Sequence, residues 1–340
     1  MRARAGAAGK QNRGLDYSSR SPKGRGSASD DKMSPFPTFS RLPVVAAVIA
    51  ALCVAAGLAC APVARADDEP LQEKPLSQIS DNSIGLLGQK ALQIHENDWK
   101  HAETAHFVYH YFDSFIANPV AVEAEFYYRM ISKELDKDTT QWERKCHIYI
   151  FEQDEDWHQF QKVGGLEPWS GGIHSQGQLF IQRNPQRKFK GNSLAHEVTH
   201  LVVHRFYGEG IPLWLDEGFA EYAASRWYAS FYRMRGYNAR PRSASVAPDS
   251  YLTVNALTSL VSYPQQDNEV LTFYAESERL VRFLSVADKQ GFLQFLDAMG
   301  RGNRFDTALE KGFGSKFFNV EALNEQFKPY AVKDYVESSN

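Results

Sequence analysis

The feature that most restricts the fold is the string His196-Glu197-Val198-Thr199-His200, which lies inside a helical apolar pattern over residues 194–206. On a helix, residues four apart lie one above the other, so the two imidazoles can bind one metal ion together. The apolar stripe of this helix is formed by Leu194, Val198, Leu201, Val202 and Phe206. Imidazoles without a partner would be costly in the middle of such an apolar helix. The alternative is a surface helix with solvated histidines. The pattern favours a buried helix with a metal site.

Glu197 has a different position from the two histidines on the same helix. At 3.6 residues per turn, its side chain is turned about 100° from that of His196. It therefore lies beside the expected ligands rather than among them, within reach of a water molecule at the metal. This is the placement of a general base.

A third metal ligand is expected downstream, because catalytic zinc sites take three protein ligands and leave a fourth position open. Glu217 follows His200 by 17 residues, and Gly208, Gly210 and Pro212 between them allow the chain to reverse into a second helix. Glu221 stands one turn further along that helix. We expect it to accept the ring proton of a ligand histidine. The alternative for both glutamates is a solvated helix face.

The block Trp214-Leu215-Asp216-Glu217-Gly218-Phe219-Ala220-Glu221-Tyr222 and the His196–His200 string together resemble gluzincin metallopeptidases, in the style of secreted peptidase-MA-like proteins. The resemblance implies a zincin-like fold, with a small mixed sheet over the active-site helix and a mostly helical C-terminal part. It also implies Zn²⁺ as the cofactor, with His196, His200 and Glu217 as its ligands and Glu197 as the catalytic base.

The same resemblance points to Tyr274, on a later helical stretch, as the group that stabilises the developing oxyanion. Ordinary core packing is the alternative role for this tyrosine. The sequence that anchors a free amine in related aminopeptidases is absent here, which favours an endopeptidase. A peptide or protein is then the expected substrate.

The remaining pattern predicts an α+β fold. Strands are expected at residues 105–112, 146–151 and 178–182, the last as a candidate edge strand, and helices at 118–137, 154–163 and 215–234. Further helices are expected at 268–285, 289–299, 304–312 and 318–328. We divide this part into a catalytic subdomain, residues 105–222, and a helical C-terminal subdomain, residues 223–340. Residues 67–104 are polar and are expected to form an irregular spacer or arm.

Residues 1–66 differ sharply in charge from the rest of the chain. They hold ten of its 38 Lys and Arg residues and three of its 41 Asp and Glu residues. An apolar run at 44–61 is followed by Ala64-Arg65-Ala66, which predicts a basic low-complexity leader and a signal peptide cut after Ala66. An uncleaved membrane anchor at 44–61, lipidation at Cys60 and a start at Met33 are the alternatives. Either way, we expect export to the periplasm, the cell envelope or the exterior.

The net charge of −3 gives no indication of nucleic-acid binding. The leading hypothesis is an exported zinc metallopeptidase. Two other hypotheses remain: a zincin-fold binding module of the cell envelope without catalysis, and a zinc hydrolase of a non-peptide bond. A fourth protein ligand on the metal would favour the first of these two.

Overall fold

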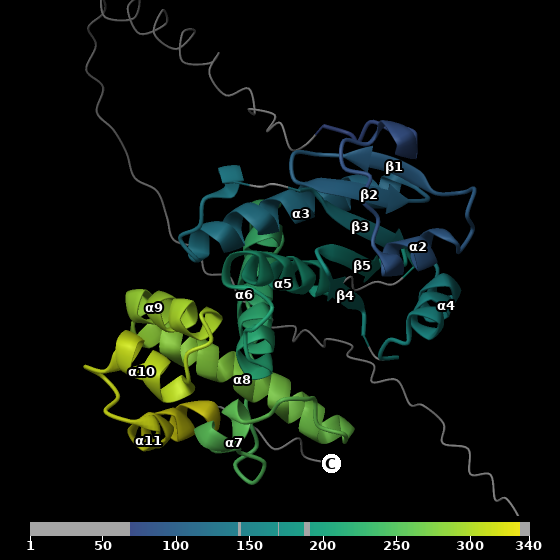
Figure 1. Ribbon diagram of the computed structural model, residues 1–340. Coiled ribbons are helices and arrows are strands. Elements are labelled where there is room, and N and C mark those ends of the chain that lie inside the picture. Colours follow the sequence, from purple (N-terminus) through teal and green to yellow (C-terminus); the bar gives the residue numbers. More distant parts are fainter. Residues whose placement is uncertain (1–68, 142–143, 169, 187–190, 334–340) are drawn as a thin grey trace, which may run out of the picture. The chain divides into compact units, whose positions relative to one another are not determined.

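The computed structural model of the protein describes residues 69–141, 144–168, 170–186 and 191–333 (Figure 1). The signal segment, the cleavage site and Cys60 lie outside the described residues, so their predicted roles stay predictions. Among the helices of the described ranges, none is both long enough and apolar enough to cross a membrane.

A five-stranded mixed sheet forms the upper layer of the structure in Figure 1, in the order β1-β2-β3-β5-β4. The outer pairs β1–β2 and β4–β5 are antiparallel, and the inner pairs β2–β3 and β3–β5 are parallel. The strands are β1 (Lys100–Glu103), β2 (Phe107–Tyr111), β3 (Cys146–Phe151), β4 (Gly172–Ser175) and β5 (Gln178–Gln182). The expectation of an edge at residues 178–182 is wrong, because β5 lies between β3 and β4.

Both faces of the sheet are covered by helices. Ile148 and Ile150 of β3 join the core under α3 (Ser114–Glu134) and α5 (Ser193–Tyr207). The alternate residues Tyr149 and Phe151 pack on the opposite side, in the cluster under α2 (Leu86–Leu92) and α4 (Asp154–Gly164). A strand buried on both faces reads as a continuous apolar run, which is why residues 146–151 were predicted at their true bounds.

Helix α6 (Leu213–Met234) connects the sheet layer to the helical part of the chain (Figure 1). It packs against α5 and against α8 (Asp267–Ala287). The remaining helices are α7 (Val254–Thr258), α9 (Lys289–Gly300), α10 (Phe305–Phe313) and α11 (Val320–Ala331), with short 3₁₀ turns at Leu76–Gln78 and Thr139–Gln141. The predicted α+β class and the small mixed sheet over an internal helix are confirmed.

The reversal between α5 and α6 follows from the residues between them. Gly208 ends α5 with φ 81°, a left-handed value that glycine adopts without steric strain. Pro212 occupies the N-cap position of α6 in an extended conformation, and its missing backbone N–H costs no helical hydrogen bond there. The two helices can therefore pack side by side over a short connection.

Several elements differ from the sequence prediction. Helix α3 begins at Ser114, before the predicted residue 118, because the Asp113 side chain caps it by accepting from the Phe115 N–H. Pro119 lies inside α3, not at its start. Strand β4 and the short helix α7 were not predicted.

Residues 69–104 are not an irregular spacer, as predicted, but carry α2 and β1. The Lys74 N–H donates to the carbonyl of His101 in β1, at 2.8 Å. Glu103 at the end of β1 accepts from Lys74 at 2.7 Å and from Lys145 at 2.8 Å. This part of the chain therefore belongs to the folded layer around the sheet.

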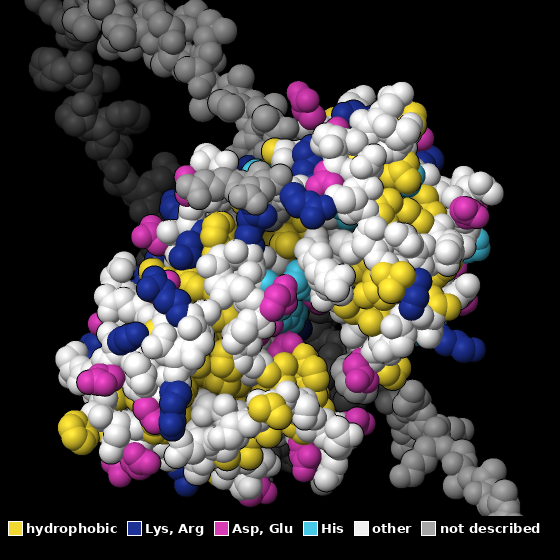
Figure 2. All heavy atoms as spheres, viewed as in Figure 1, with side chains coloured by type: hydrophobic (Ala, Val, Ile, Leu, Met, Phe, Trp, Pro, Cys, Tyr) yellow, Lys and Arg dark blue, Asp and Glu magenta, His cyan; other side chains and the backbone are white. Residues whose placement is uncertain are grey.

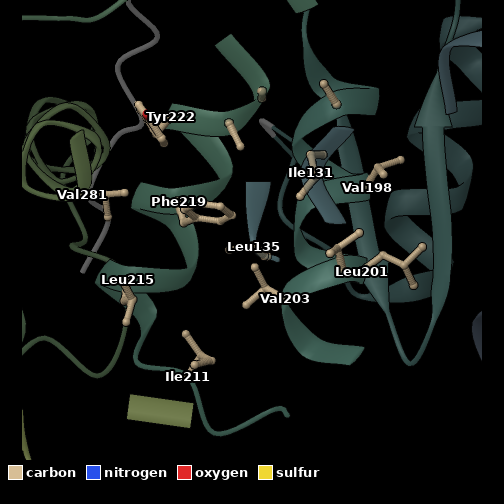
Figure 3. Packing of buried hydrophobic residues seen from close by; sticks show 14 of the residues in the cluster. Ile131, Leu135, Val198, Leu201, Val203, Ile211, Leu215, Phe219, Tyr222 and Val281 are labelled. Carbon is tan, nitrogen blue, oxygen red and sulfur yellow. The ribbon is translucent and has the colours of Figure 1, made fainter. Parts of the chain in front are cut away.

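Gly218 allows α6 to approach α8 closely. A Cβ atom at this position would lie 2.4 Å from the backbone oxygen of Ser277 in α8. Leu215 lies on the same side of α6 as Gly218, toward Val281 of α8, whereas Phe219 points to the other side, toward Leu201 and Val203 of α5 (Figure 3). The close packing of α6 against α8 thus depends on the absence of a side chain at Gly218.

Replacement of Gly218 by alanine should destabilise the fold by about 1–3 kcal/mol, because the new methyl group meets backbone that cannot rotate away. Gly210→Ala is the matched control, since nothing lies within 4 Å of its Cβ position, and it should change stability by less than about 0.5 kcal/mol. Urea denaturation of both variants measures the difference. Equal stabilities would contradict the close contact of α6 and α8.

Glu276 of α8 is fully buried and accepts a hydrogen bond from the Leu252 N–H at 3.1 Å. Its other carboxylate oxygen has no hydrogen-bond partner within the described ranges of the chain. Burial, only partly opposed by the Leu252 N–H, raises the pKa of Glu276 to about 8. The folded protein therefore holds this proton more tightly than the unfolded chain does.

Stability should consequently fall as the pH rises from about 4.5 to about 8, by at most about 1.4 kcal/mol per pH unit from this group. Glu276→Gln should remove that slope, whereas Glu325→Gln, at an exposed position, should keep it. Thermal denaturation at several pH values gives the slopes. A variant at Glu276 with the wild-type slope would contradict the assignment.

Candidate metal centre

The structure brings His196, His200 and Glu217 together where α5 and α6 face each other. The two Nε2 atoms lie 3.0 Å apart. Glu217 Oε2 lies 3.3 Å from Nε2 of His196 and 3.6 Å from Nε2 of His200. Figure 2 shows histidine side chains, in cyan, exposed in a hollow on this face beside acidic and hydrophobic side chains.

These three donors fit a metal ion. Ligands about 2.0–2.2 Å from a tetrahedral zinc ion lie about 3.3–3.5 Å from one another, close to the separations found here. Glu217 Oε2 is buried and has no hydrogen-bond partner within the described residues. A buried carboxylate oxygen without a partner is costly, and a cation between it and the imidazoles would satisfy it.

Each ligand histidine also contacts a carboxylate of α6 through its other ring nitrogen. Glu221 Oε1 lies 3.0 Å from Nδ1 of His196; the sequence analysis expected Glu221 to contact a ligand histidine but did not say which one. Asp216 Oδ1 lies 2.9 Å from Nδ1 of His200. Sequence analysis did not predict the contact of Asp216 with His200, although the place of Asp216 directly before Glu217 in the first turn of α6 is the signal that could have found it.

Opposite charges set the protonation of the metal-free site. Burial disfavours the charged ring of His196, but Glu217 and Glu221 outweigh it and raise the pKa of His196 to about 10. Burial opposes the ionised form of Glu217 as well, yet the charges of His200 and His196 hold its pKa well below the usual range. A divalent cation would replace these ring protons, since its ligands must be deprotonated.

Glu197 lies on the neighbouring face of α5 and points toward the edge strand β4. A Cβ atom at Gly172 of β4 would lie 2.7 Å from Oε1 of Glu197, so only glycine leaves room for the carboxylate there. Burial raises the pKa of Glu197, although His196 and His200 partly oppose the rise. A carboxylate with a raised pKa is a stronger base near neutral pH.

Tyr274 lies close enough to the centre to be affected by the charge of Glu217, and a second tyrosine, Tyr263, packs against it. The role of Tyr274 in stabilising an oxyanion stays a prediction. The rings of Tyr263 and Tyr274 stack with centroids 6.1 Å apart. The Tyr263 hydroxyl donates to Oε1 of Glu217. Burial and the charge of Glu217 raise the pKa of both hydroxyls, which keeps them protonated as donors. Tyr263 was not predicted, because it precedes α8 in an irregular segment without a motif.

His204, one turn beyond His200, is not within the group formed by His196, His200 and Glu217. Its Nε2 lies 2.8 Å from Oδ2 of Asp216, in a hydrogen bond. The ring of His174 in β4 lies against it, with centroids 4.9 Å apart. Burial, with His200 and His204 nearby, lowers the pKa of His174 to about 3.

Comparison with known proteins gives one family. The model of the peptidase MA superfamily matches residues 130–333, more than half of the chain. The matched range contains α5, α6 and α8, and with them all the residues described in this centre. A search of curated proteins finds no match to the chain.

The carboxylates behind the histidines should strengthen metal binding, because they orient the rings and increase their basicity. Glu221→Gln and Asp216→Asn should each weaken Zn²⁺ affinity by about 10- to 100-fold. Competition with a zinc-chelating dye measures the affinity, and Glu325→Gln, far along the chain on an exposed face, is the control. Unchanged affinity in both variants would show that these contacts do not support a metal.

Proposed function

Because this chain belongs to the peptidase MA superfamily, we propose that it is a zinc-dependent endopeptidase of the gluzincin type. The observation that carries the proposal is the buried Oε2 of Glu217, which faces two imidazole nitrogens without a hydrogen bond among the described residues. His196, His200 and Glu217 would hold Zn²⁺. Bound there, zinc would supply a Lewis acid and lower the pKa of water toward about 7.

Glu197 is the proposed general base. It would take a proton from the water that attacks the peptide carbonyl and pass this proton to the leaving amine. Its position supports the role, because it lies on α5 directly beside the ligands and against β4 without itself belonging to the ligand group. Its raised pKa lets one carboxyl accept and then release the proton near neutral pH.

The two tyrosines would stabilise the oxyanion. Tyr274 keeps its proposed role, and Tyr263 joins it, since both hydroxyls stay protonated beside Glu217. The substrate would pair by backbone hydrogen bonds with β4, the outer strand of the sheet that lies next to α5. The contact of Gly172 with Glu197 would place such a peptide next to the base.

The composition of the centre favours catalysis over a purely structural metal. Within the described residues, three donors converge on this position, whereas structural zinc sites are closed by four. We further propose that the protein acts outside the cytoplasm, exported by the segment at 44–61, which would leave the mature chain after Ala66.

Glu197→Gln should keep bound zinc and lower peptide hydrolysis by about 100-fold or more, since proton transfer is lost while the ligands remain. Hydrolysis of a diverse peptide library, with zinc content from elemental analysis, gives both readouts. The matched control is Glu325→Gln on exposed α11, which should hydrolyse the library as the wild type does. Zinc-free native protein, or equal hydrolysis in the Glu197 variant, would refute the proposed function.

A further inference from the structure

A second group of donor atoms lies on the far side of the His200 ring from Glu217. It consists of His200, His204 and Asp216, with one donor atom from each within 4.8 Å of the others. Asp216 lies between the two rings, 2.9 Å from Nδ1 of His200 through Oδ1 and 2.8 Å from Nε2 of His204 through Oδ2. This group therefore uses the ring nitrogen of His200 that the first centre leaves free.

The contact between Nδ1 of His200 and Oδ1 of Asp216 is an ion pair at 2.9 Å that does not have the geometry of a hydrogen bond. Nδ1 of His200 and Oδ1 of Asp216 are both buried, and neither has a hydrogen-bond partner of acceptable geometry among the described residues. The side chain of His200 is 8% exposed. A buried ring nitrogen and a buried carboxylate oxygen that face each other without a hydrogen bond indicate a group that binds between or beside them.

The surroundings of His204 suit a metal ligand. When Nε2 of an imidazole binds a metal, Nδ1 carries the proton and needs an acceptor. Glu209 supplies one, because its Oε2 lies 2.9 Å from Nδ1 of His204. Nδ1 has no hydrogen bond in the metal-free arrangement, in which Nε2 donates to Asp216 instead.

We propose that His200, Asp216 and His204 bind a second divalent transition-metal ion, such as Zn²⁺. His200 would bridge the two ions through its two ring nitrogens, giving up its Nδ1 proton, and the ions would lie about 6 Å apart. This ion binds more weakly than the first, since an imidazole must lose a second proton. Two imidazoles and a carboxylate select zinc-like metals over Mg²⁺ or Ca²⁺.

The second ion regulates the first centre; this part of the inference rests on the proposed function. It withdraws Asp216 from its role as a partner of His200 and alters the electron density that His200 offers to the first ion. Excess zinc should therefore inhibit hydrolysis.

Equilibrium dialysis against increasing Zn²⁺, followed by elemental analysis, tests the site without reference to activity. The wild type should bind two ions per chain, the second at least about 10-fold more weakly, and His204→Gln should bind one. His158→Gln, at an exposed position in α4, is the control for adventitious binding by surface histidines and should bind two. Thermal denaturation confirms that each variant is folded.

The two proposals fail differently. A wild type that binds no zinc overturns both. A single ion that His204→Gln retains overturns the second site and leaves the proposed function standing. For the regulatory role, the rate of hydrolysis at excess zinc is compared with the rate of the same protein at one equivalent of zinc. This rate should fall at least about 10-fold in the wild type and stay level in His204→Gln. Equal inhibition of both proteins overturns the regulatory role.

Discussion

The contact between the carboxylates of α6 and the imidazoles of α5 determines the rest of this structure. Asp216, Glu217 and Glu221 all lie in the first turns of α6, and each contacts a histidine of α5 within 3.6 Å. Ionised groups are buried only when they are paired, so the rotation of one helix against the other is fixed by these contacts. The N-terminal end of α6 also favours the negative charge of Asp216 in its first turn.

The features that depend on interactions between residues close in the chain could be predicted from the sequence, and those that depend on distant residues could not. The histidines and glutamates of α5 and α6 were predicted together because helical spacing and a short connection are local properties of the chain. The inner strand β3 was predicted for a similar reason, its continuous apolar run. Strands β1 and β4 were missed, because each has four residues with little apolar alternation and is held in place by pairing with a neighbour.

The centre itself divides in the same way. Glu221 contacts a ligand histidine, His196, and this kind of contact could be predicted because Glu221 shares a helix face with Glu217. Tyr263 and His174 come from segments whose approach depends on the packing of distant elements, the sheet edge and the start of α8. Their roles are not encoded in any short motif. The sequence also did not show that β5 lies inside the sheet and β4 at its edge, because both strands are short and follow each other in the chain.

The close contact at Gly218 has a consequence for motion. Gly218 follows Glu217 directly, and it touches the backbone of Ser277, one helical turn from Tyr274. Glu217 of α6 and Tyr274 of α8 thus belong to one stiff unit of two helices, which can move only as a body. Among the described residues, the extensive contacts of strand β4 are those with α5 and β5. Any change of shape around this centre is therefore left to the sheet edge, while α6 and α8 keep their positions relative to each other.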